Sequence, residues 1–387
     1  MSAVSHSTRA PATSQPAPVR AKDHYVILDG LRGVAAVVVV VFHLFEVYSN
    51  SNPFKQIINH GYLAVDFFFM LSGFVVAYAY DDRWTRMSQW EFYKRRLIRL
   101  QPMVIMGSLI GAALFYFQAG PVSPKISSTS VSTMLFAMLL GCAMVPISRS
   151  MDIRGWGEMY PLNSPTWSLF YEYIGNVLYA VGLRRLSNRA LMVVVFLTAV
   201  MLLYVAMFRF GGSLSGGWSL DGAQPLLGFS RLLFPFCAGV LLMRLRKRIH
   251  VRGAFGLCSV LLIVALAIPR IGGPQHNWMN GLYEALCVIV VFPFIIAIGA
   301  GDMRAGGRSI GVARFFGDLS YPLYITHYPL MYLYWGWAIP KKIPAAQGAA
   351  VGALLLIASI AVAYACLKLY DLPIRRWLSR SFVARDR

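Results

Sequence analysis

An arginine and a histidine on one face of the first long apolar segment are the residues best suited to chemistry in this chain. Arg32 and His43 stand eleven residues apart, and residues 34–42 between them are almost unbrokenly apolar. On a helix, eleven residues return to within about 20° of the same face and rise about 16 Å. An ionisable side chain is costly in hydrocarbon, so His43 indicates a functional site, and Glu46 one turn beyond could orient its ring. The alternative is a structural imidazole bonded to a neighbouring helix.

Polar side chains also interrupt the next two apolar segments. Asp66 lies one to two turns inside the second segment, where an isolated carboxylate favours a role in binding, or in charging a neighbouring group, over packing. The nearby Ser72-Gly73 pair instead predicts close packing against another helix. Arg95 and Arg99 share a helix face at the start of the third segment and suit bidentate phosphate binding, although the same basic run is also a topology signal.

Two later segments carry hydroxyl, carboxylate and imidazole groups close together. Ser168 and Glu172 are four residues apart, so their side chains project one above the other from a helix. Tyr324 and His327 lie on adjacent turns of a segment nearer the C-terminus. Intramembrane histidines combined with carboxylates and hydroxyls indicate general-base chemistry on an alcohol.

The composition excludes a water-soluble domain. The chain has 387 residues, is 57% hydrophobic and 13% charged, and has a mean hydropathy of +0.57, which is typical of a polytopic α-helical membrane protein. The net charge of +20 does not indicate nucleic-acid binding, because the basic residues fall in short clusters between apolar segments, as in positive-inside topology. The five cysteines lack paired spacing, so neither a disulfide framework nor a metal site is expected.

Eleven apolar segments are long enough to be considered as membrane spans. If all of them crossed, the basic connectors could not lie on one side, because alternation fails between residues 100 and 184. We therefore expect 131–147 to be re-entrant, since it is short and contains Gly141 and Pro146. The result is an all-α transmembrane bundle of about ten spans with both termini in the cytoplasm. The eleven segments are 28–48, 62–80, 102–118, 131–147, 166–183, 190–208, 229–243, 253–270, 280–300, 315–337 and 346–370.

Three regions are expected along the chain. Residues 1–22 are rich in Ser, Ala, Pro and Thr and predict a disordered cytoplasmic tail rather than a signal peptide. Residues 23–378 make up the transmembrane domain, and 379–387 are a basic cytoplasmic tail.

Taken together, these motifs resemble the acyltransferase 3 family of bacterial integral-membrane O-acyltransferases. The resemblance runs from Tyr25 to about Trp377, which is nearly the whole chain beyond the tail. Each motif alone would be weak, but five in the right order are specific. They are 28–33 with His43, 61–74, 95–102, 167–169 with Glu172, and 319–327.

The resemblance implies an inner-membrane enzyme that modifies polysaccharides or related molecules. Such enzymes move an acyl group, most often acetyl, from cytoplasmic acyl-coenzyme A to a hydroxyl of an extracytoplasmic glycan, lipid-linked sugar or glycosylated metabolite. By resemblance, Arg32 and His43 are essential for transfer. We expect His43 to act as general base or to take the acyl group transiently. We expect Arg32, helped by Arg95 and Arg99, to bind the phosphates of coenzyme A, and Glu172 to orient a histidine or the acceptor.

The acceptor is expected to contact Asp66, Ser168, Tyr324 and His327. Unlike for the fused members, we expect no periplasmic hydrolase-like domain after the last span, so we expect either that the membrane domain completes transfer alone or that a separate periplasmic partner finishes it. Two other classes stay open. A proton-coupled transporter or exporter would use the intramembrane histidines and Glu172 as a relay, but the sequence has no convincing pair of inverted repeats. A non-catalytic membrane assembly protein would be favoured by failure to bind acyl-coenzyme A.

Overall fold

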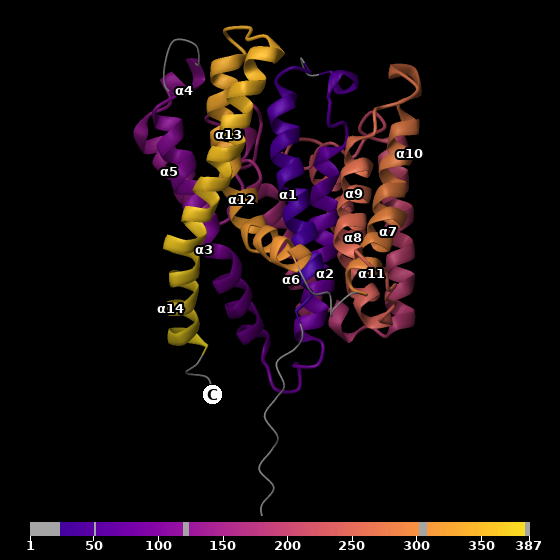
Figure 1. Ribbon diagram of the computed structural model, residues 1–387. Coiled ribbons are helices and arrows are strands. Elements are labelled where there is room, and N and C mark those ends of the chain that lie inside the picture. The colour runs from indigo at the N-terminus through magenta and orange to yellow at the C-terminus, as the bar shows by residue number, and fades with distance from the viewer. Residues whose placement is uncertain (1–23, 50–51, 119–123, 302–307, 384–387) are drawn as a thin grey trace, which may run out of the picture.

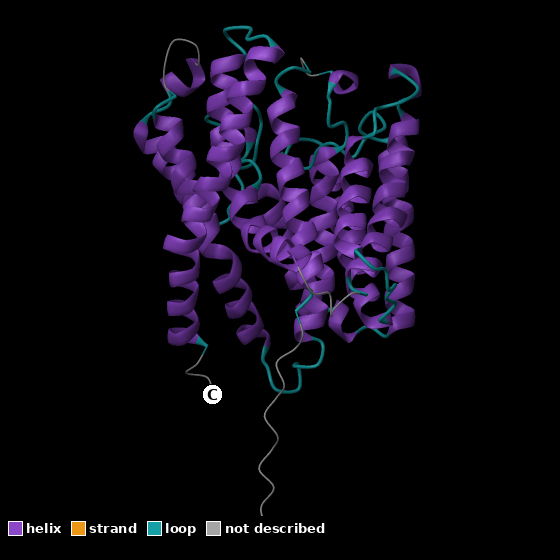
Figure 2. Ribbon diagram, viewed as in Figure 1, coloured by secondary structure: helices purple, strands orange, loops and turns teal. Residues whose placement is uncertain are grey.

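The computed structural model describes residues 24–49, 52–118, 124–301 and 308–383, and helices are the only regular elements in these ranges (Figure 2). The predicted all-α fold class is confirmed. The helices are α1 (Val26–Glu46), α2 (Ala64–Tyr80), α3 (Gln89–Tyr116), α4 (Pro124–Ser128), α5 (Val131–Cys142), α6 (Thr166–Val181), α7 (Asn188–Phe208), α8 (Gln224–Leu245), α9 (Ala254–Ala267), α10 (Trp278–Leu286), α11 (Phe292–Gly299), α12 (Arg308–Ala338), α13 (Ala345–Cys366) and α14 (Leu372–Phe382).

Seven helical stretches in the described ranges are long and apolar enough to cross a membrane, and they stand side by side in one bundle (Figure 1). They are α1, α2, α3, α7, α8, the joined α10–α11 and the joined α13–α14. The other predicted spans are shorter or more polar: α6 has 16 residues, α9 has 14, and the 31 residues of α12 include three charged residues in its N-terminal part and many tyrosines. The chain is thus a multi-pass membrane protein, while the number of ten spans stays a prediction.

The expected re-entrant segment corresponds to α5, which has 12 residues. Such a helix is about 18 Å long, well short of the roughly 30 Å hydrocarbon core. The chain that follows α5 reaches the connector between α7 and α8, where the Met159 amide donates to the Trp218 carbonyl at 2.9 Å. This contact agrees with a segment that does not complete a crossing.

The structure describes part of the predicted C-terminal tail but none of the predicted N-terminal tail. The tail at 1–22 lies outside the described residues. At the other end, α14 continues to Phe382, so the first residues of the predicted basic tail are helical.

The third helix begins earlier than its apolar segment suggests. It starts at Gln89, thirteen residues before 102, because Ser88 and Glu91 form a capping box at its N-terminus. Pro102 therefore lies inside α3 rather than at its start. As a result, Arg95 and Arg99 stand on a continuous helix that leads into the bundle.

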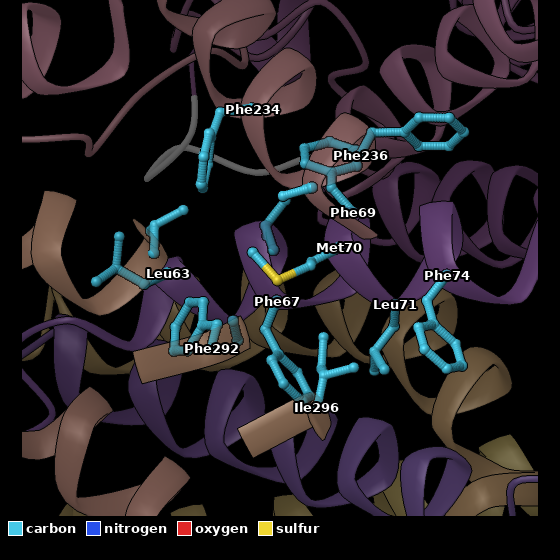
Figure 3. Close-up of a cluster of buried hydrophobic side chains, with 14 of the residues drawn as sticks. Leu63, Phe67, Phe69, Met70, Leu71, Phe74, Phe234, Phe236, Phe292 and Ile296 are labelled. Atoms are coloured by element: carbon cyan, nitrogen blue, oxygen red, sulfur yellow. The ribbon is translucent and has the colours of Figure 1, made fainter. Parts of the chain in front are cut away.

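Small residues let two helix pairs approach closely. A Cβ at Gly73 of α2 would lie 2.1 Å from the Phe236 carbonyl oxygen of α8, and one at Gly239 of α8 would lie 2.0 Å from the Met70 carbonyl oxygen. The packing role predicted for Ser72-Gly73 is confirmed. Around this contact Phe67, Met70 and Phe292 are fully buried, which joins α2, α8 and α11 in one apolar core (Figure 3).

The first and twelfth helices pack in the same way. A Cβ at Gly33 would lie 2.1 Å from the Phe316 carbonyl oxygen of α12. This close approach brings the two helices that carry Arg32, His43, Tyr324 and His327 against each other. The pairing therefore positions most of the candidate site.

Candidate active site

Two cavities enter the bundle from opposite ends of α1 and meet at Val65 and Tyr324, which line both. The basic-end cavity, of about 490 Å³, borders the start of α1 and includes Arg32, Ser72, Arg96, Arg99, Ser168 and Glu172. The His43 cavity, of about 590 Å³, borders the end of α1 and includes His43, Glu46, Trp156, Glu158, Trp218 and Trp335. Arg32 and His43 therefore open into different cavities, with a thin partition at Tyr324 between them.

Arg32 is held in place by its own helix and by α12. Its Nε donates to the Ser320 hydroxyl at 2.8 Å, and its Nη2 lies 3.2 Å from a carboxylate oxygen of Asp29. The side chain is 24% exposed, so the guanidinium still faces the basic-end cavity. A positioned but accessible guanidinium suits binding of a phosphate or carboxylate.

The predicted Ser168 and Glu172 pair lines the basic-end cavity, as expected for residues four apart on α6. Glu172 accepts hydrogen bonds from the Ser72 hydroxyl at 2.7 Å and from Arg96 Nη2 at 2.8 Å. The Ser168 hydroxyl lies 2.8 Å from the Tyr324 hydroxyl. Glu172 thus pairs with an arginine in the basic-end cavity, and the carboxylate beside the His43 ring is a different one.

His43 has the geometry of an oriented base. Its Nδ1 lies 2.8 Å from a carboxylate oxygen of Glu46, so the orienting role predicted for Glu46 is confirmed. Because an ionised carboxylate can only accept, Nδ1 is the donor in this contact, and in a neutral imidazole the lone pair is then on Nε2. The Trp335 indole donates to the His43 carbonyl at 3.1 Å, and the Tyr328 ring packs edge-on at 4.8 Å. These contacts fix the ring while it remains part of the cavity wall.

His327 lies behind His43 rather than in the lining of either cavity. It is fully buried, and its ring stacks on that of His43 at 5.6 Å with an interplanar angle of 28°. Its Nδ1 faces the carbonyls of Leu323 and Tyr324 at 3.1 and 2.8 Å. Its Nε2 has no hydrogen-bond partner among the described residues. Of the two residues predicted on this segment, Tyr324 reaches the cavities and His327 supports the His43 ring.

Asp66 forms a buried ion pair with Arg231. Its carboxylate lies 2.6 Å from Nη2 of Arg231 on α8, and both side chains are fully buried. Arg231 also donates to the Tyr62 carbonyl at 2.7 Å and the Gly216 carbonyl at 2.8 Å. Asp66 lines neither cavity, whereas Arg231 and Tyr62 form part of the wall of the His43 cavity. Of the two roles weighed for Asp66, the structure places it as the partner of a neighbouring charge.

Aromatic rings and one further carboxylate complete the His43 cavity. Glu158 lies in the connector before α6 and accepts a hydrogen bond from the Tyr332 hydroxyl at 2.5 Å. Arg154 stacks over the Tyr332 ring, with its Cζ 3.5 Å from the ring centroid. Burial raises the pKa of Glu158 to about 7. A cavity of tryptophan rings with a few directed polar groups suits a small, partly apolar ligand that also forms hydrogen bonds.

The family of the chain follows from a domain match. An acyltransferase domain model of the acyltransferase 3 type matches residues 25–368. The chain belongs to the acyltransferase 3 family. Arg32, His43 and both cavities lie almost entirely within this matched range.

Curated relatives of this acyltransferase include known O-acetyltransferases. It is 26% identical over 330 residues to O-acetyltransferase OatA of Staphylococcus aureus, which covers 82% of this chain and 52% of the relative. It is 32% identical over 191 residues to protein 2 in the picA locus of Rhizobium radiobacter, covering 48% of this chain and 95% of that protein. The chain thus spans about half the length of OatA. No solved structure matches it.

Sequence analysis singled out Arg32 and His43 but missed several residues that contact the candidate residues or line the cavities. Arg96, Ser320, Arg231 and Glu158 were not singled out, although each contacts a candidate residue or a cavity. The signal for Glu158 was the stretch Arg154-Gly-Trp-Gly-Glu158, in which both glycines have positive φ and form a tight polar connector. Among the residues the structure describes, no group of three or more potential metal ligands is gathered.

Proposed function

We propose that this O-acyltransferase moves an acyl group, with acetyl as the leading candidate, from cytoplasmic acyl-coenzyme A to a hydroxyl of an extracytoplasmic glycan, lipid-linked sugar or glycosylated metabolite. The observation that carries the proposal is the pair of cavities that meet at Tyr324. One cavity is lined by arginines that suit a phosphorylated donor, and the other holds an oriented imidazole beside tryptophan rings. This arrangement supports transfer across the membrane at the partition.

The donor side follows from the charge of the connectors. The basic clusters at 81–99, 184–189 and 244–252 are expected in the cytoplasm, on the side where the basic-end cavity opens. Arg32 and Arg99 line that cavity, so they would contact donor phosphates, with the acyl-pantetheine arm reaching toward Tyr324. This direction would place both termini and the bulk of coenzyme A in the cytoplasm of a bacterial inner membrane.

The chemistry requires a base on the acceptor side. In the proposed step, His43 Nε2 takes the proton of the acceptor hydroxyl, and the oxygen attacks the thioester carbonyl. The C–S bond then breaks, the ester remains on the acceptor, and the departing thiolate of coenzyme A takes up a proton. Transient acylation of His43 is the two-step form of the same reaction. Ser168 and Tyr324 lie where the acyl group would cross between the cavities.

The acceptor would bind in the His43 cavity. Trp156, Trp218 and Trp335 offer flat apolar surfaces for a sugar ring, and Glu158 offers a hydrogen-bond partner for a hydroxyl. The OatA relatives are about twice as long as the match to this chain. We therefore retain both routes to the product: transfer completed within this domain, or completed by a separate extracytoplasmic transferase.

Donor binding and chemistry can be separated by two substitutions. Arg32→Ala should weaken acetyl-coenzyme A binding by about 1.5–3 kcal/mol, the usual strength of a charge-assisted hydrogen bond, or roughly 10- to 150-fold. His43→Ala should bind the donor nearly normally but abolish transfer. Arg32→Lys should recover only in part, because an ammonium cannot form the planar fork. Calorimetric titration and release of the coenzyme A thiol measure the two properties in purified protein.

The opposite pattern would refute the assignment. If Arg32→Ala keeps full donor affinity while His43→Ala loses it, the donor does not bind in the basic-end cavity. A wild-type protein that fails to bind acyl-coenzyme A would favour the assembly-protein alternative, and proton-coupled substrate uptake without ester formation would favour the transporter.

Orientation can be tested by labelling single cysteines in a Cys-free variant. Cysteines at Lys55, Ser215 and Gln275 should react with a membrane-impermeant reagent from outside, whereas those at Trp90 and Arg248 should react only after permeabilisation. Each variant is first checked for donor binding, so that misfolded protein is not counted. Labelling of position 248 from outside would overturn the proposed direction of transfer.

A further inference from the structure

A third cavity, which we name the arginine cavity, lies beside the basic-end cavity and is unusual in its charge. It has a volume of about 620 Å³, and no aspartate or glutamate is among its lining residues. Seven of its fourteen lining residues are arginines from three segments of the chain: Arg83, Arg95, Arg96, Arg99, Arg375, Arg376 and Arg380. Positively charged side chains repel one another in a shared cavity, and a polyanionic ligand would offset this repulsion. The arrangement therefore favours a polyanion as the ligand.

Helix α14 turns one face toward this cavity. The residues that it and its C-cap contribute are Leu372, Arg375, Arg376, Ser379, Arg380 and Val383. Their spacing of three, one, three, one and three residues is that of a single helix face. Helix α14 lies beside the outer part of α3 at the end of the molecule where α1 begins (Figure 1). The arginines on this face therefore point into the cavity between two helices.

Protein carboxylates neutralise only part of this charge. Arg96 pairs with Glu172 at 2.8 Å, and Arg375 with Asp371 at 3.1 Å. Among the described residues, Arg95 and Arg99 have no ion-pair partner, and the Nε of Arg95 is buried with no hydrogen bond. A buried donor without a partner costs free energy unless a ligand supplies the acceptor. Half-buried guanidinium groups without carboxylates thus indicate a site for phosphate.

The arginine cavity continues into the basic-end cavity. Val75, Arg96, Arg99, Leu372 and Arg375 line both. A ligand with several phosphates at one end and a long thin arm could occupy both at once. A lipid headgroup shares the phosphate chemistry, but one phosphodiester would leave most of the seven arginines without a counter-charge.

We propose that the arginine cavity binds the phosphorylated nucleotide end of the acyl-coenzyme A donor, and that Arg376 and Arg380 of α14 are its outer contacts. This inference rests on the proposed function, because it takes acyl-coenzyme A to be the donor. The 3′-phosphate accepts forked hydrogen bonds from the arginines of α14, the pyrophosphate lies toward Arg99 and Arg32 where the two cavities join, and the pantetheine arm continues into the basic-end cavity. Helix α14 is then part of the donor site and not merely the end of a membrane anchor.

The test uses the double variant Arg376→Gln/Arg380→Gln in the full-length protein. Both residues are exposed and have no partner within the described chain, so the change should not disturb folding. The matched control is Arg185→Gln/Arg189→Gln, which removes the same charge from two exposed positions outside the arginine cavity, one on the α6–α7 connector and one in the first turn of α7. Coenzyme A, dephospho-coenzyme A and S-acetylpantetheine are compared in zwitterionic nanodiscs.

The double variant should bind coenzyme A at least tenfold more weakly than wild type, and the control less than twofold. The preference of wild type for coenzyme A over dephospho-coenzyme A should shrink in the double variant. The ratio of kcat/KM for acetyl-coenzyme A to that for S-acetylpantetheine should fall at least tenfold. Arg376→Lys/Arg380→Lys should restore part of this ratio, since the charge remains.

Three results would overturn the inference, and they point to different errors. Equal coenzyme A affinity in the double variant and the control, with transfer intact, refutes the role of α14 but leaves the proposed function standing. Loss of bound anionic lipid by native mass spectrometry, with coenzyme A affinity unchanged, assigns the cavity to a lipid headgroup. Failure of wild type to bind or use any coenzyme A compound refutes both the proposed function and this inference.

Discussion

Replacing Asp66 by asparagine would remove one charge from a pair that is fully buried. Arg231 would keep its bonds to the carbonyls of Tyr62 and Gly216 but would lose the carboxylate at 2.6 Å. Removing one partner of a buried ion pair costs about 3–5 kcal/mol, because the remaining charge is left without compensation. We expect about 3 kcal/mol for Asp66→Asn, since the amide oxygen can still accept one hydrogen bond.

Equilibrium unfolding in mixed micelles, followed by tryptophan fluorescence, measures this loss. Trp167 is a suitable reporter, because the Arg231 guanidinium lies 5.1 Å from its ring centroid. The double variant Asp66→Leu/Arg231→Met removes both charges and should be more stable than Asp66→Leu alone. An unchanged unfolding free energy in Asp66→Asn, together with a higher KM for the acceptor, would show that Asp66 contacts substrate and that the ion pair is not part of the framework.

Two further substitutions test the packing and the acceptor cavity. Gly73→Ala should destabilise the protein by several kcal/mol or prevent folding, because its Cβ would lie 2.1 Å from the Phe236 carbonyl oxygen. The control is Gly311→Ala, whose Cβ would have no atom within 4 Å and which should change the unfolding free energy by no more than about 1 kcal/mol. Similar unfolding of the two variants would contradict the α2–α8 contact. Burial raises the pKa of Glu158 from 4.5 to about 7, so the folded protein favours the neutral carboxyl group. The contribution of this group to the free energy of unfolding is fully present below pH 4.5 and is lost as the pH rises through about 7. Glu158→Gln should remove that decline, which is at most about 3.5 kcal/mol for 2.5 pH units at about 1.4 kcal/mol per unit. Identical pH profiles of unfolding for Glu158→Gln and wild type would refute it.

The parts of the site that could be predicted from sequence are those set by the geometry of one helix. His43 and Glu46 are three residues apart and meet at 2.8 Å, and Ser168 and Glu172 share one face of α6. Such neighbours follow from 3.6 residues per turn whatever the rest of the fold does. The same rule placed Arg32 and His43 on one stripe, but it could not show that the stripe opens into two cavities.

What the sequence could not show depends on contacts between distant segments. Asp66 meets Arg231 across 165 positions, and Glu172 meets Arg96 across 76. No local pattern in a single sequence encodes these pairs, so the sequence left Asp66 between binding and charging a neighbouring group, and assigned Glu172 to orienting a histidine or the acceptor. The start of α3 was missed for another reason: hydropathy marks where a helix becomes apolar, while Ser88 and Glu91 decide where it begins.

The partition between the cavities also has to block the flow of protons across the membrane. Val65 and Tyr324 line both cavities, Tyr324 is 6% exposed, and the Phe68 ring packs edge-on against it at 5.3 Å. A continuous file of water at this point would conduct protons down the membrane potential, which is worth about 2.3 kcal/mol per charge at 100 mV. If acyl groups cross here as proposed, the gap that admits a thioester must remain closed to hydronium. During turnover, proton leakage would then be prevented only while the substrate itself fills the gap. A Tyr324→Ala enzyme that leaks protons would dissipate the proton gradient in proportion to the number of copies in the membrane.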